Sequence, residues 1–466
     1  MKAVFVGAGS LRVLGIVRGA LAEPGIFEGG EICLHDLDAN RADAMRRMIE
    51  KSPEYSRVSC KLTCESNLAK ALDGADMVGV ILMAGSQKTF QMGADACLRR
   101  GFIPSDNVSP NGAFLAIKGA PILMNLAKKM ARYCPNAWLV DFANPIAVLS
   151  GMINNHTKIK SLGVCAGYTN HQWDLSRIFG KDEQGTAFDV ETAGINHLSF
   201  IVKGTANGRN LFDALDERLS NGWRMPRLQL NWSPAFKKSI PLGIRTLIKF
   251  YRERGILIFS TEGDGMMHLR YEDALADCLK DFKPFSPRRL NAKLHAAAKA
   301  RLKADKHFRS FIRRELDRNF WENAWRKPGM DWARRQDRDI FVDVLRGLSG
   351  VKKMKVVTSR PNRGAVEGFS DHTVLEYSQI IERGSVRPAG KYKIPENVRQ
   401  ITADLATHQT KLADALAERD PRLLADALLS YPVRSFSREA RMLYKDLAAI
   451  NRDEIPRPLR RVVNYL

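Results

Sequence analysis

The fold is decided by residues 2–10, which read Lys2-Ala3-Val4-Phe5-Val6-Gly7-Ala8-Gly9-Ser10. Residues 2–6 predict a short buried strand, and a helical pattern of apolar residues begins directly after Ser10. Glycine at positions 7 and 9 allows a tight turn that can approach a phosphate, while a helix N-terminus favours negative charge. The stretch therefore predicts a dinucleotide-binding turn, with Gly7, Gly9 and Ser10 at the pyrophosphate.

An acidic residue ends the next predicted strand, which covers residues 31–36. Asp36 stands where a carboxylate binds the ribose hydroxyls of NAD and would repel the 2′-phosphate of NADP. The fingerprint is incomplete, because Arg12 occupies its third glycine position. A plain strand-to-helix turn would also use glycine. The combination of strand, turn, helix and acid leads us to expect NAD.

Strands and helices alternate up to about residue 190, which predicts a parallel sheet with helices on both faces. Beyond that point the sequence predicts antiparallel strands over 187–203 and then mainly helices. Further expected elements are a strand at 256–259, helices at 271–281 and 289–320, a polar loop region at 328–372, a strand at 373–381 and helices from 395 to 450. We expect an α/β fold: a Rossmann-like domain over 1–190, followed by an α+β domain over 191–466. This architecture resembles the lactate and malate dehydrogenase superfamily.

The composition excludes several classes of protein. Among the 466 residues no apolar run reaches the roughly 18 residues of a membrane helix, and we expect no secretory signal. Seven scattered cysteines favour a reducing cytoplasm over a disulfide scaffold. The net charge of +22 suits an anionic ligand, but acids interleave with the basic residues of 285–340, as on solvated helix faces. We expect no nucleic-acid or membrane partner.

Polar side chains stand where three predicted strands end. They are Asn144, Cys165 and the pair Asn196-His197. Taken singly, a cysteine is most often a small buried apolar residue and a histidine a hydrogen-bonded structural one. Together, at strand ends that face a nucleotide, sulfur and imidazole can bind a divalent metal and leave positions open for substrate oxygens.

The order of these motifs resembles the NAD- and divalent-metal-dependent family-4 glycoside hydrolases, which include α-glucosidases, α-galactosidases and 6-phospho-glycosidases. The stretches that carry the resemblance are Gly7-Ala8-Gly9-Ser10, Asp36-Leu37-Asp38, Ala75-Asp76-Met77-Val78, Cys134-Pro135-Asn136-Ala137-Trp138, Asn144-Pro145, Gly163-Val164-Cys165 and Gly194-Ile195-Asn196-His197. The resemblance implies that Cys165 and His197 bind the metal, with Mn²⁺ the expected ion. It also implies that Asn144 and Asn196 contact the sugar.

The activity that the resemblance implies is glycoside cleavage by a redox-assisted elimination, outside the usual two-carboxylate scheme. NAD takes a hydride from C3, and the metal polarises the resulting ketone so that the C2 proton becomes acidic. A base removes that proton, the aglycone leaves C1, water adds, and the hydride returns.

The mechanism also needs a base and an acid, and the sequence offers candidates for both. Asp264, in a predicted Gly-Asp-Gly turn after the strand at 256–259, is the expected base, with Tyr271 and His268 as alternatives; such an aspartate is also common in ordinary turns. Some family members place a carboxylate directly after the metal cysteine, where this chain has Ala166. Asp106 is the substitute acid that we consider.

Two other functions remain open from the sequence. A plain dehydrogenase of the lactate/malate type would share the Rossmann core but needs no metal. A basic nucleotide-sensing or nucleic-acid-binding protein would use Arg318-Asn319-Phe320-Trp321 and Trp325-Arg326, which equally suit a subunit interface or helix packing. For the glycosidase we expect a homodimer or homotetramer and a small-molecule glycoside. The sugar and anomer stay open, and the basic charge favours an anionic glycoside.

Overall fold

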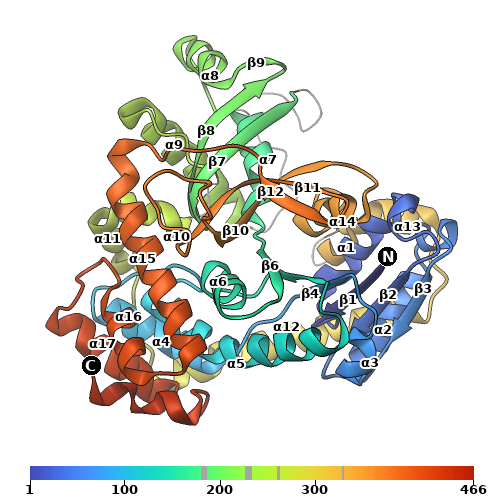
Figure 1. The fold of residues 1–466 in the computed structure, drawn as a ribbon, viewed down its shortest axis with the longest axis horizontal. Helices are drawn as coiled ribbons and strands as arrows, with labels where there is room; N and C mark the ends of the chain where they lie inside the picture. Colours follow the sequence, from blue (N-terminus) through green and yellow to red (C-terminus); the bar gives the residue numbers. More distant parts are fainter. Residues whose placement is uncertain (180–185, 226–233, 260–262, 328–329) are drawn as a thin grey trace.

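The computed structural model describes residues 1–179, 186–225, 234–259, 263–327 and 330–466. Within these residues the strands form one 12-stranded sheet, in the order β3-β2-β1-β4-β5-β6-β10-β11-β7-β8-β9, with β12 beside β11. Figure 1 shows the N-terminal strands at one end of the molecule and the C-terminal helices at the other.

The N-terminal part of the sheet is parallel, as its alternating strands and helices predict. Its strands are β1 (Lys2–Val6), β2 (Glu31–His35), β3 (Lys61–Cys64), β4 (Met77–Val80), β5 (Trp138–Asp141) and β6 (Lys160–Gly163). The helices around it are α1 (Leu11–Leu21), α2 (Ala39–Glu50), α3 (Leu68–Leu72), α4 (Gln87–Arg99), α5 (Pro110–Tyr133), α6 (Ile146–His156) and α7 (Gly167–Phe179).

The C-terminal part is α+β with antiparallel pairing, also as expected. Its strands are β7 (Phe188–Ile195), β8 (Leu198–Ala206), β9 (Arg209–Asn210), β10 (Met354–Pro361), β11 (Val374–Glu382) and β12 (Ser385–Pro388). Its helices are α8 (Leu211–Ser220), α9 (Pro234–Arg254), α10 (Gly263–Met266), α11 (Tyr271–Lys280), α12 (Pro287–Ile312), α13 (Arg318–Asn323), α14 (Ile340–Ser349), α15 (Glu396–Glu418), α16 (Pro421–Leu429) and α17 (Arg438–Ile450). The two parts share one sheet, because β10 pairs with β6.

Three expected elements were wrong in detail. The region 328–372 contains α14 and β10, although its polar composition predicts loops; residues 328–329 lie outside the described chain. Asp339 caps α14 and Gly350 ends it in a left-handed conformation, so the helix carries ordinary start and stop signals. Residues 256–259 form an isolated bridge to β8 in place of a strand. The helix expected over 289–320 is divided between α12 and α13.

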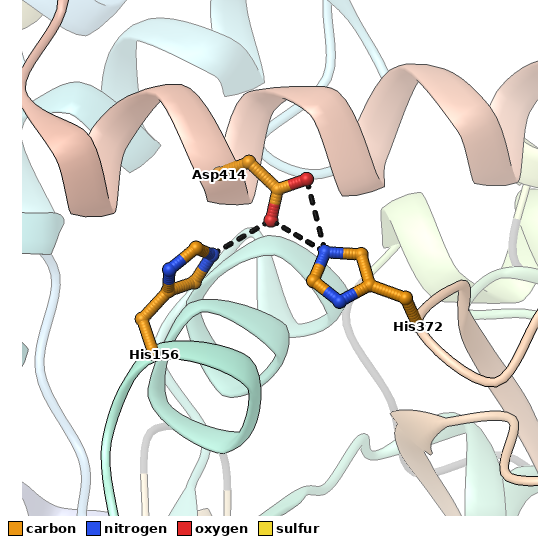
Figure 2. A group of neighbouring side chains, drawn as sticks. All are labelled: His156, His372 and Asp414. Carbon is orange, nitrogen blue, oxygen red and sulfur yellow. Dashed lines mark hydrogen bonds and ion pairs between the residues drawn. The ribbon is translucent and has the colours of Figure 1, made fainter.

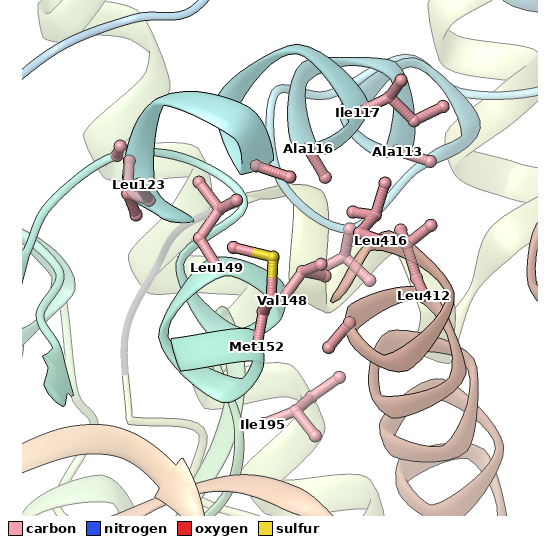
Figure 3. Close-up of a cluster of buried hydrophobic side chains, with 14 of the residues drawn as sticks. Ala113, Ala116, Ile117, Leu123, Val148, Leu149, Met152, Ile195, Leu412 and Leu416 are labelled. Atoms are coloured by element: carbon pink, nitrogen blue, oxygen red, sulfur yellow. The ribbon is translucent and has the colours of Figure 1, made fainter. Parts of the chain in front are cut away.

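The main apolar core lies where α5, α6 and α15 meet beside β7 (Figure 3). Ala113 and Ala116 of α5 lie in this cluster with Leu149 of α6 and with Leu412 and Leu416 of α15. Small alanine side chains let the helices approach closely, while the leucines fill the space between them. This packing fixes α6, whose first residue directly follows Asn144 and Pro145.

The remaining expectations from composition concern surface and compartment. Most of α12 is exposed, with only Leu290, Phe308 and Phe311 buried, so its basic side chains lie on a solvated face. None of the seven cysteines forms a disulfide. In the described residues, no helix combines the length and the apolar character needed to cross a membrane.

Candidate active site

The two expected metal ligands lie together. Cys165 follows β6 at its carboxyl end, and His197 stands at the tip of the β7–β8 hairpin. The Cys165 Sγ lies 3.3 Å from the His197 Nε2, and the backbone N–H of Gly167 points at the same sulfur from 3.4 Å. A separation of 3.3 Å is that of neighbouring ligands of one ion when the bonds are about 2.1 and 2.3 Å long.

The backbone of His197 adopts an uncommon conformation. Its φ is +68°, at the second position of the two-residue turn between Ile195 and Leu198. Glycine or asparagine normally fills such a position, since other side chains are strained there. Strain of this kind persists where the surrounding structure enforces it, and it is concentrated at functional sites.

Asp264 contacts the other side of the His197 ring. Its Oδ1 is hydrogen-bonded to the His197 Nδ1, so the imidazole lies between a carboxylate and the cysteine sulfur. Because an ionised carboxylate only accepts hydrogen bonds, Nδ1 carries the proton and Nε2 presents its lone pair toward Cys165. This is the arrangement by which a carboxylate orients a metal-binding histidine.

The segment around Asp264 is the short helix α10, not the turn predicted from its glycines. Gly265 is required by the close approach of α10 to the hairpin. A Cβ at this position would lie 1.6 Å from the carbonyl oxygen of His197. Gly265, one of the two glycines that suggested a turn, thus lets Asp264 reach His197 because it has no side chain.

The Asp264 carboxylate is held in its ionised form. Burial opposes ionisation, but the interaction with His197, helped by Ser105 and His268, outweighs it and places the pKa of Asp264 below its usual value. The alternatives for the base are engaged elsewhere. The Tyr271 hydroxyl accepts the backbone N–H of Ile103, and burial raises its pKa to about 12. The His268 Nε2 contacts the hydroxyl of Tyr431, and burial lowers the pKa of His268 to about 4.

Glu376 is a second carboxylate, which the sequence did not indicate as functional, and it is hydrogen-bonded to the β7–β8 hairpin. Glu376 of β11 is 4% exposed. It accepts hydrogen bonds from the Asn196 Nδ2 at 2.7 Å and from the Ser199 Oγ at 3.0 Å. The available signal was a glutamate inside the otherwise apolar start of a strand, Val374-Leu375-Glu376-Tyr377. Glu376 and Asn196 also line a small pocket together with Cys165, Gly167, Tyr168, His197, Ser199, Phe259 and Val357.

The loop before α5 brings further polar groups to the site. Asp106 accepts a hydrogen bond from the Asn144 Nδ2 at 2.9 Å, and the Asn107 side chain donates to that of Asn196. The side-chain oxygens of Asn144 and Asn107 are buried and accept no hydrogen bond from the described residues. Both are therefore acceptors that suit a ligand rich in hydroxyl groups. Asn107 is a second site residue that the sequence did not single out.

The glycine turn lies at the same edge of the sheet, because β1, β2, β5 and β6 are parallel and end there. Gly7 has a φ of +85°, and a Cβ on it would lie 2.1 Å from the carbonyl oxygen of Ile81. The backbone N–H of Gly9 donates to the Asp36 carboxylate at 2.8 Å, and Ser10 caps α1. The residues present thus fit a dinucleotide, because the N-terminus of α1 lies next to the Asp36 carboxylate.

Arg12, which breaks the glycine fingerprint, joins this edge to the C-terminal part. Its guanidinium pairs with Asp339 and lies 4.2 Å from the ring centroid of Phe142. Phe142 comes two residues before Asn144. An arginine is tolerated at this position because its side chain extends across the strand ends toward α14.

Comparison with known families agrees with this geometry. The model of the family 4 glycosyl hydrolases matches residues 2–180, and that of their C-terminal domain matches residues 192–433. The chain belongs to family 4 of the glycosyl hydrolases. The resemblance stated from the sequence motifs is therefore confirmed. The chain does not belong to a family of plain dehydrogenases or of nucleic-acid-binding proteins.

Relatives of this family 4 enzyme differ in the substrates that their names give. An α-galactosidase from Bacillus subtilis is 28% identical over 222 residues, which are 47% of this chain and 50% of that protein. An α-galacturonidase from Thermoanaerobacter italicus is 24% identical over 444 residues, which are 90% of this chain and 89% of that protein.

Solved structures share the fold at low sequence identity. A 6-phospho-α-glucosidase from gut microorganisms, crystallised with NAD and Mn²⁺, has a TM-score of 0.78 at 15% identity and covers 98% of this chain and 99% of its own. A lactate dehydrogenase from a deep-sea metagenome has a TM-score of 0.50 at 12% identity and covers 89% of this chain and 98% of its own. The architecture expected from the sequence is thus confirmed.

Proposed function

We propose that this family 4 enzyme cleaves glycosides with NAD at the glycine turn and a divalent ion, Mn²⁺, at Cys165 and His197. The observation that carries the proposal is the 3.3 Å contact between the Cys165 Sγ and the His197 Nε2, at the sheet edge that also holds Gly7, Gly9 and Asp36. The NAD and Mn²⁺ in the similar 6-phospho-α-glucosidase support the same assignment. In this proposal residues 1–190 bind NAD and residues 191–466 supply most of the substrate and metal contacts.

When bound, NAD would accept and return the C3 hydride, and the metal would polarise the C3 carbonyl so that the C2 proton becomes acidic. The protein's own groups then move protons and hold the sugar. Asn144 and Asn196 bind sugar hydroxyls, and Asn107 and Glu376 hold Asn196 in place. Asp106, exposed at the edge of the site beside Asn144, gives a proton to the leaving oxygen.

Asp264 combines two tasks in this proposal. Its Oδ1 orients His197, while its Oδ2 has no hydrogen-bond partner among the described residues. Oδ2 is therefore the atom that accepts the C2 proton, and the carboxylate is already ionised for that task.

For the substrate, we propose an anionic glycoside and put galacturonides first. Curated α-galacturonidases align with 90% or more of this chain, and the +22 charge favours an anionic ligand. A 6-phospho-glycoside is the second class to test. We also propose a cytoplasmic homo-oligomer, dimer or tetramer; the absence of disulfides among the seven cysteines supports a reducing compartment.

The test is a panel of aryl glycosides, including galacturonides and 6-phospho-glycosides, with NAD and Mn²⁺ each added or withheld. We expect cleavage only with both present, no net NADH, and deuterium at C2 of product formed in D₂O. Cys165→Ser should lower Mn²⁺ affinity and abolish turnover while the circular dichroism spectrum is retained. Stoichiometric NADH would indicate a dehydrogenase, and full activity with a chelator would reject the metal.

A further inference from the structure

A second group of metal-binding side chains lies apart from the candidate active site. His156 ends α6, His372 precedes β11, and Asp414 lies on α15 (Figure 2). The Asp414 Oδ1 is 2.7 Å from the His156 Nε2 and 2.8 Å from the His372 Nε2, and its Oδ2 is 3.0 Å from the His372 Nε2. Three segments that are distant in sequence thus direct one ligand atom each to a common point.

The donor set suits a particular kind of ion. Two of the three ligands are imidazole nitrogens, which are borderline ligands and favour Zn²⁺ over Mg²⁺ or Ca²⁺; Zn²⁺ also accepts the carboxylate oxygen. Tetrahedral ligands at about 2.0–2.1 Å from Zn²⁺ lie roughly 3.3 Å apart. Each histidine Nε2 therefore needs to move only about half an ångström from the Asp414 Oδ1, and the three ligand atoms already lie within 4.8 Å of one another. The His372 side chain, 48% exposed, has the freedom to make that movement.

Neighbouring hydrogen bonds hold the three segments together without using the ligand atoms. The Asn155 Nδ2, next to His156, donates to the backbone oxygen of His372 at 3.0 Å. The backbone N–H of Val374 donates to the Thr410 Oγ1 at 3.1 Å, one turn of α15 before Asp414. The framework is therefore positioned in advance, which reduces the entropy lost when an ion binds.

We propose that His156, His372 and Asp414 form a second divalent-metal site that takes Zn²⁺, with water completing the coordination. The ion replaces the Nε2 protons that now connect both imidazoles to Asp414. The ion also connects two elements that hold residues of the candidate active site. One is α6, which begins directly after Asn144 and Pro145, and the other is β11, which contains Glu376.

The site is tested in the Cys165→Ser background, which weakens the other metal site, by competition of the full-length protein with a chromophoric Zn²⁺ chelator. We expect one tight equivalent of Zn²⁺ to remain. Adding His372→Gln to Cys165→Ser should lower the Zn²⁺ affinity by more than the roughly 10–100-fold that is typical when a residue outside the ligand set is changed. His295→Gln, which replaces an exposed histidine of α12, is the matched control and should leave the affinity unchanged.

A thermal melt provides the second measurement. Zn²⁺ should raise the melting temperature of Cys165→Ser and of the His295→Gln control, because a ligand that binds only the folded state stabilises it. The same addition should raise the melting temperature much less when His372→Gln or Asp414→Asn is combined with Cys165→Ser. Equal Zn²⁺ affinity in the His372→Gln and His295→Gln proteins, or no tight Zn²⁺ in Cys165→Ser, would overturn the proposal and leave a hydrogen-bonded triad.

Discussion

One oxygen of Asp264 fixes the ring of His197, and this contact changes what a substitution should do. From the sequence alone, Asp264→Asn should lose rate and keep its metal. With the contact in place, we expect the rate to fall by about 100-fold or more and Mn²⁺ affinity to fall by about 10–100-fold. Steady-state assays and Mn²⁺ titration measure the two effects separately.

The control for this substitution is Asp273→Asn, at an exposed acid in the first turn of α11. Asp273→Asn should change neither the rate nor the Mn²⁺ affinity. An Asp264→Asn protein with normal metal affinity but a large loss of rate would show that Asp264 acts only as the base. Normal values of both would remove it from the site.

At the scale of single residues, the sequence indicated side chains that follow strands and missed those that support them. Cys165 and His197 could be found because each follows a predicted strand. Their contact could not be predicted from the rule for parallel strand ends, since β7 runs antiparallel to β6. Glu376 and Asn107 could not, because their partner Asn196 lies 180 and 89 residues away along the chain. A single sequence contains no signal for contacts across such distances when each residue also has an ordinary structural explanation.

At the scale of elements, α10 and the β7–β8 hairpin form one unit because Gly265 lets them touch. Gly265→Ala places a methyl group against the backbone of His197, which cannot move as a flexible side chain could. We expect a loss of about 1–3 kcal/mol in unfolding free energy, with Mn²⁺ binding also impaired. Urea unfolding and metal titration measure the two effects.

Gly25→Ala is the comparison for this substitution, since its Cβ would meet only the methyl groups of the Val351 side chain, the nearer at 3.1 Å. It should leave metal binding unchanged. If Gly265→Ala binds Mn²⁺ as well as Gly25→Ala does, the close approach of α10 does not position His197.

Helices and strands with a clear hydrophobic period could be predicted, and those flanked by charged residues could not. The sequence predicts α11 and α15 close to their observed starts, because apolar residues recur at helical spacing. It fails at α14 and β10, where flanking basic residues hide short apolar runs that the core buries. The bridge at 256–259 lacks the pairing of a full strand, which no local pattern reveals.

At the scale of the whole molecule, strand order could not be read from the chain. The change in pattern near residue 190 suggests two successive domains. The structure instead inserts β10 and β11 between β6 and β7, so one sheet joins both parts and carries the candidate site across them. The pairing of β10 with β6 connects residues 359 and 163, a separation at which local propensity carries no information.

The C-terminal region is tied to the rest of the molecule through Glu454. Its carboxylate accepts the Ser86 backbone N–H at 3.2 Å and the Thr89 hydroxyl at 2.9 Å, and it pairs with Lys118 at 3.1 Å. Burial opposes the charge of Glu454, but these contacts outweigh it and lower its pKa from 4.5 to about 2. The stabilisation that it provides is therefore present above about pH 4.5 and is lost as the pH falls toward 2.

Glu454→Gln should consequently lower the free energy of unfolding at pH 7 by about 1–3 kcal/mol, because the buried Lys118 ammonium loses its charged partner. Urea unfolding of the variant and the wild type at pH 7, 5, 4 and 3 tests the sign of this linkage. The difference between the two proteins should be constant from pH 7 to 5 and should shrink below pH 4.5. Glu418→Gln, at an exposed acid near the end of α15, should show little difference at any pH. A difference for Glu454→Gln that persists unchanged down to pH 3 would mean that packing, and not the ionised carboxylate, connects this region to the fold.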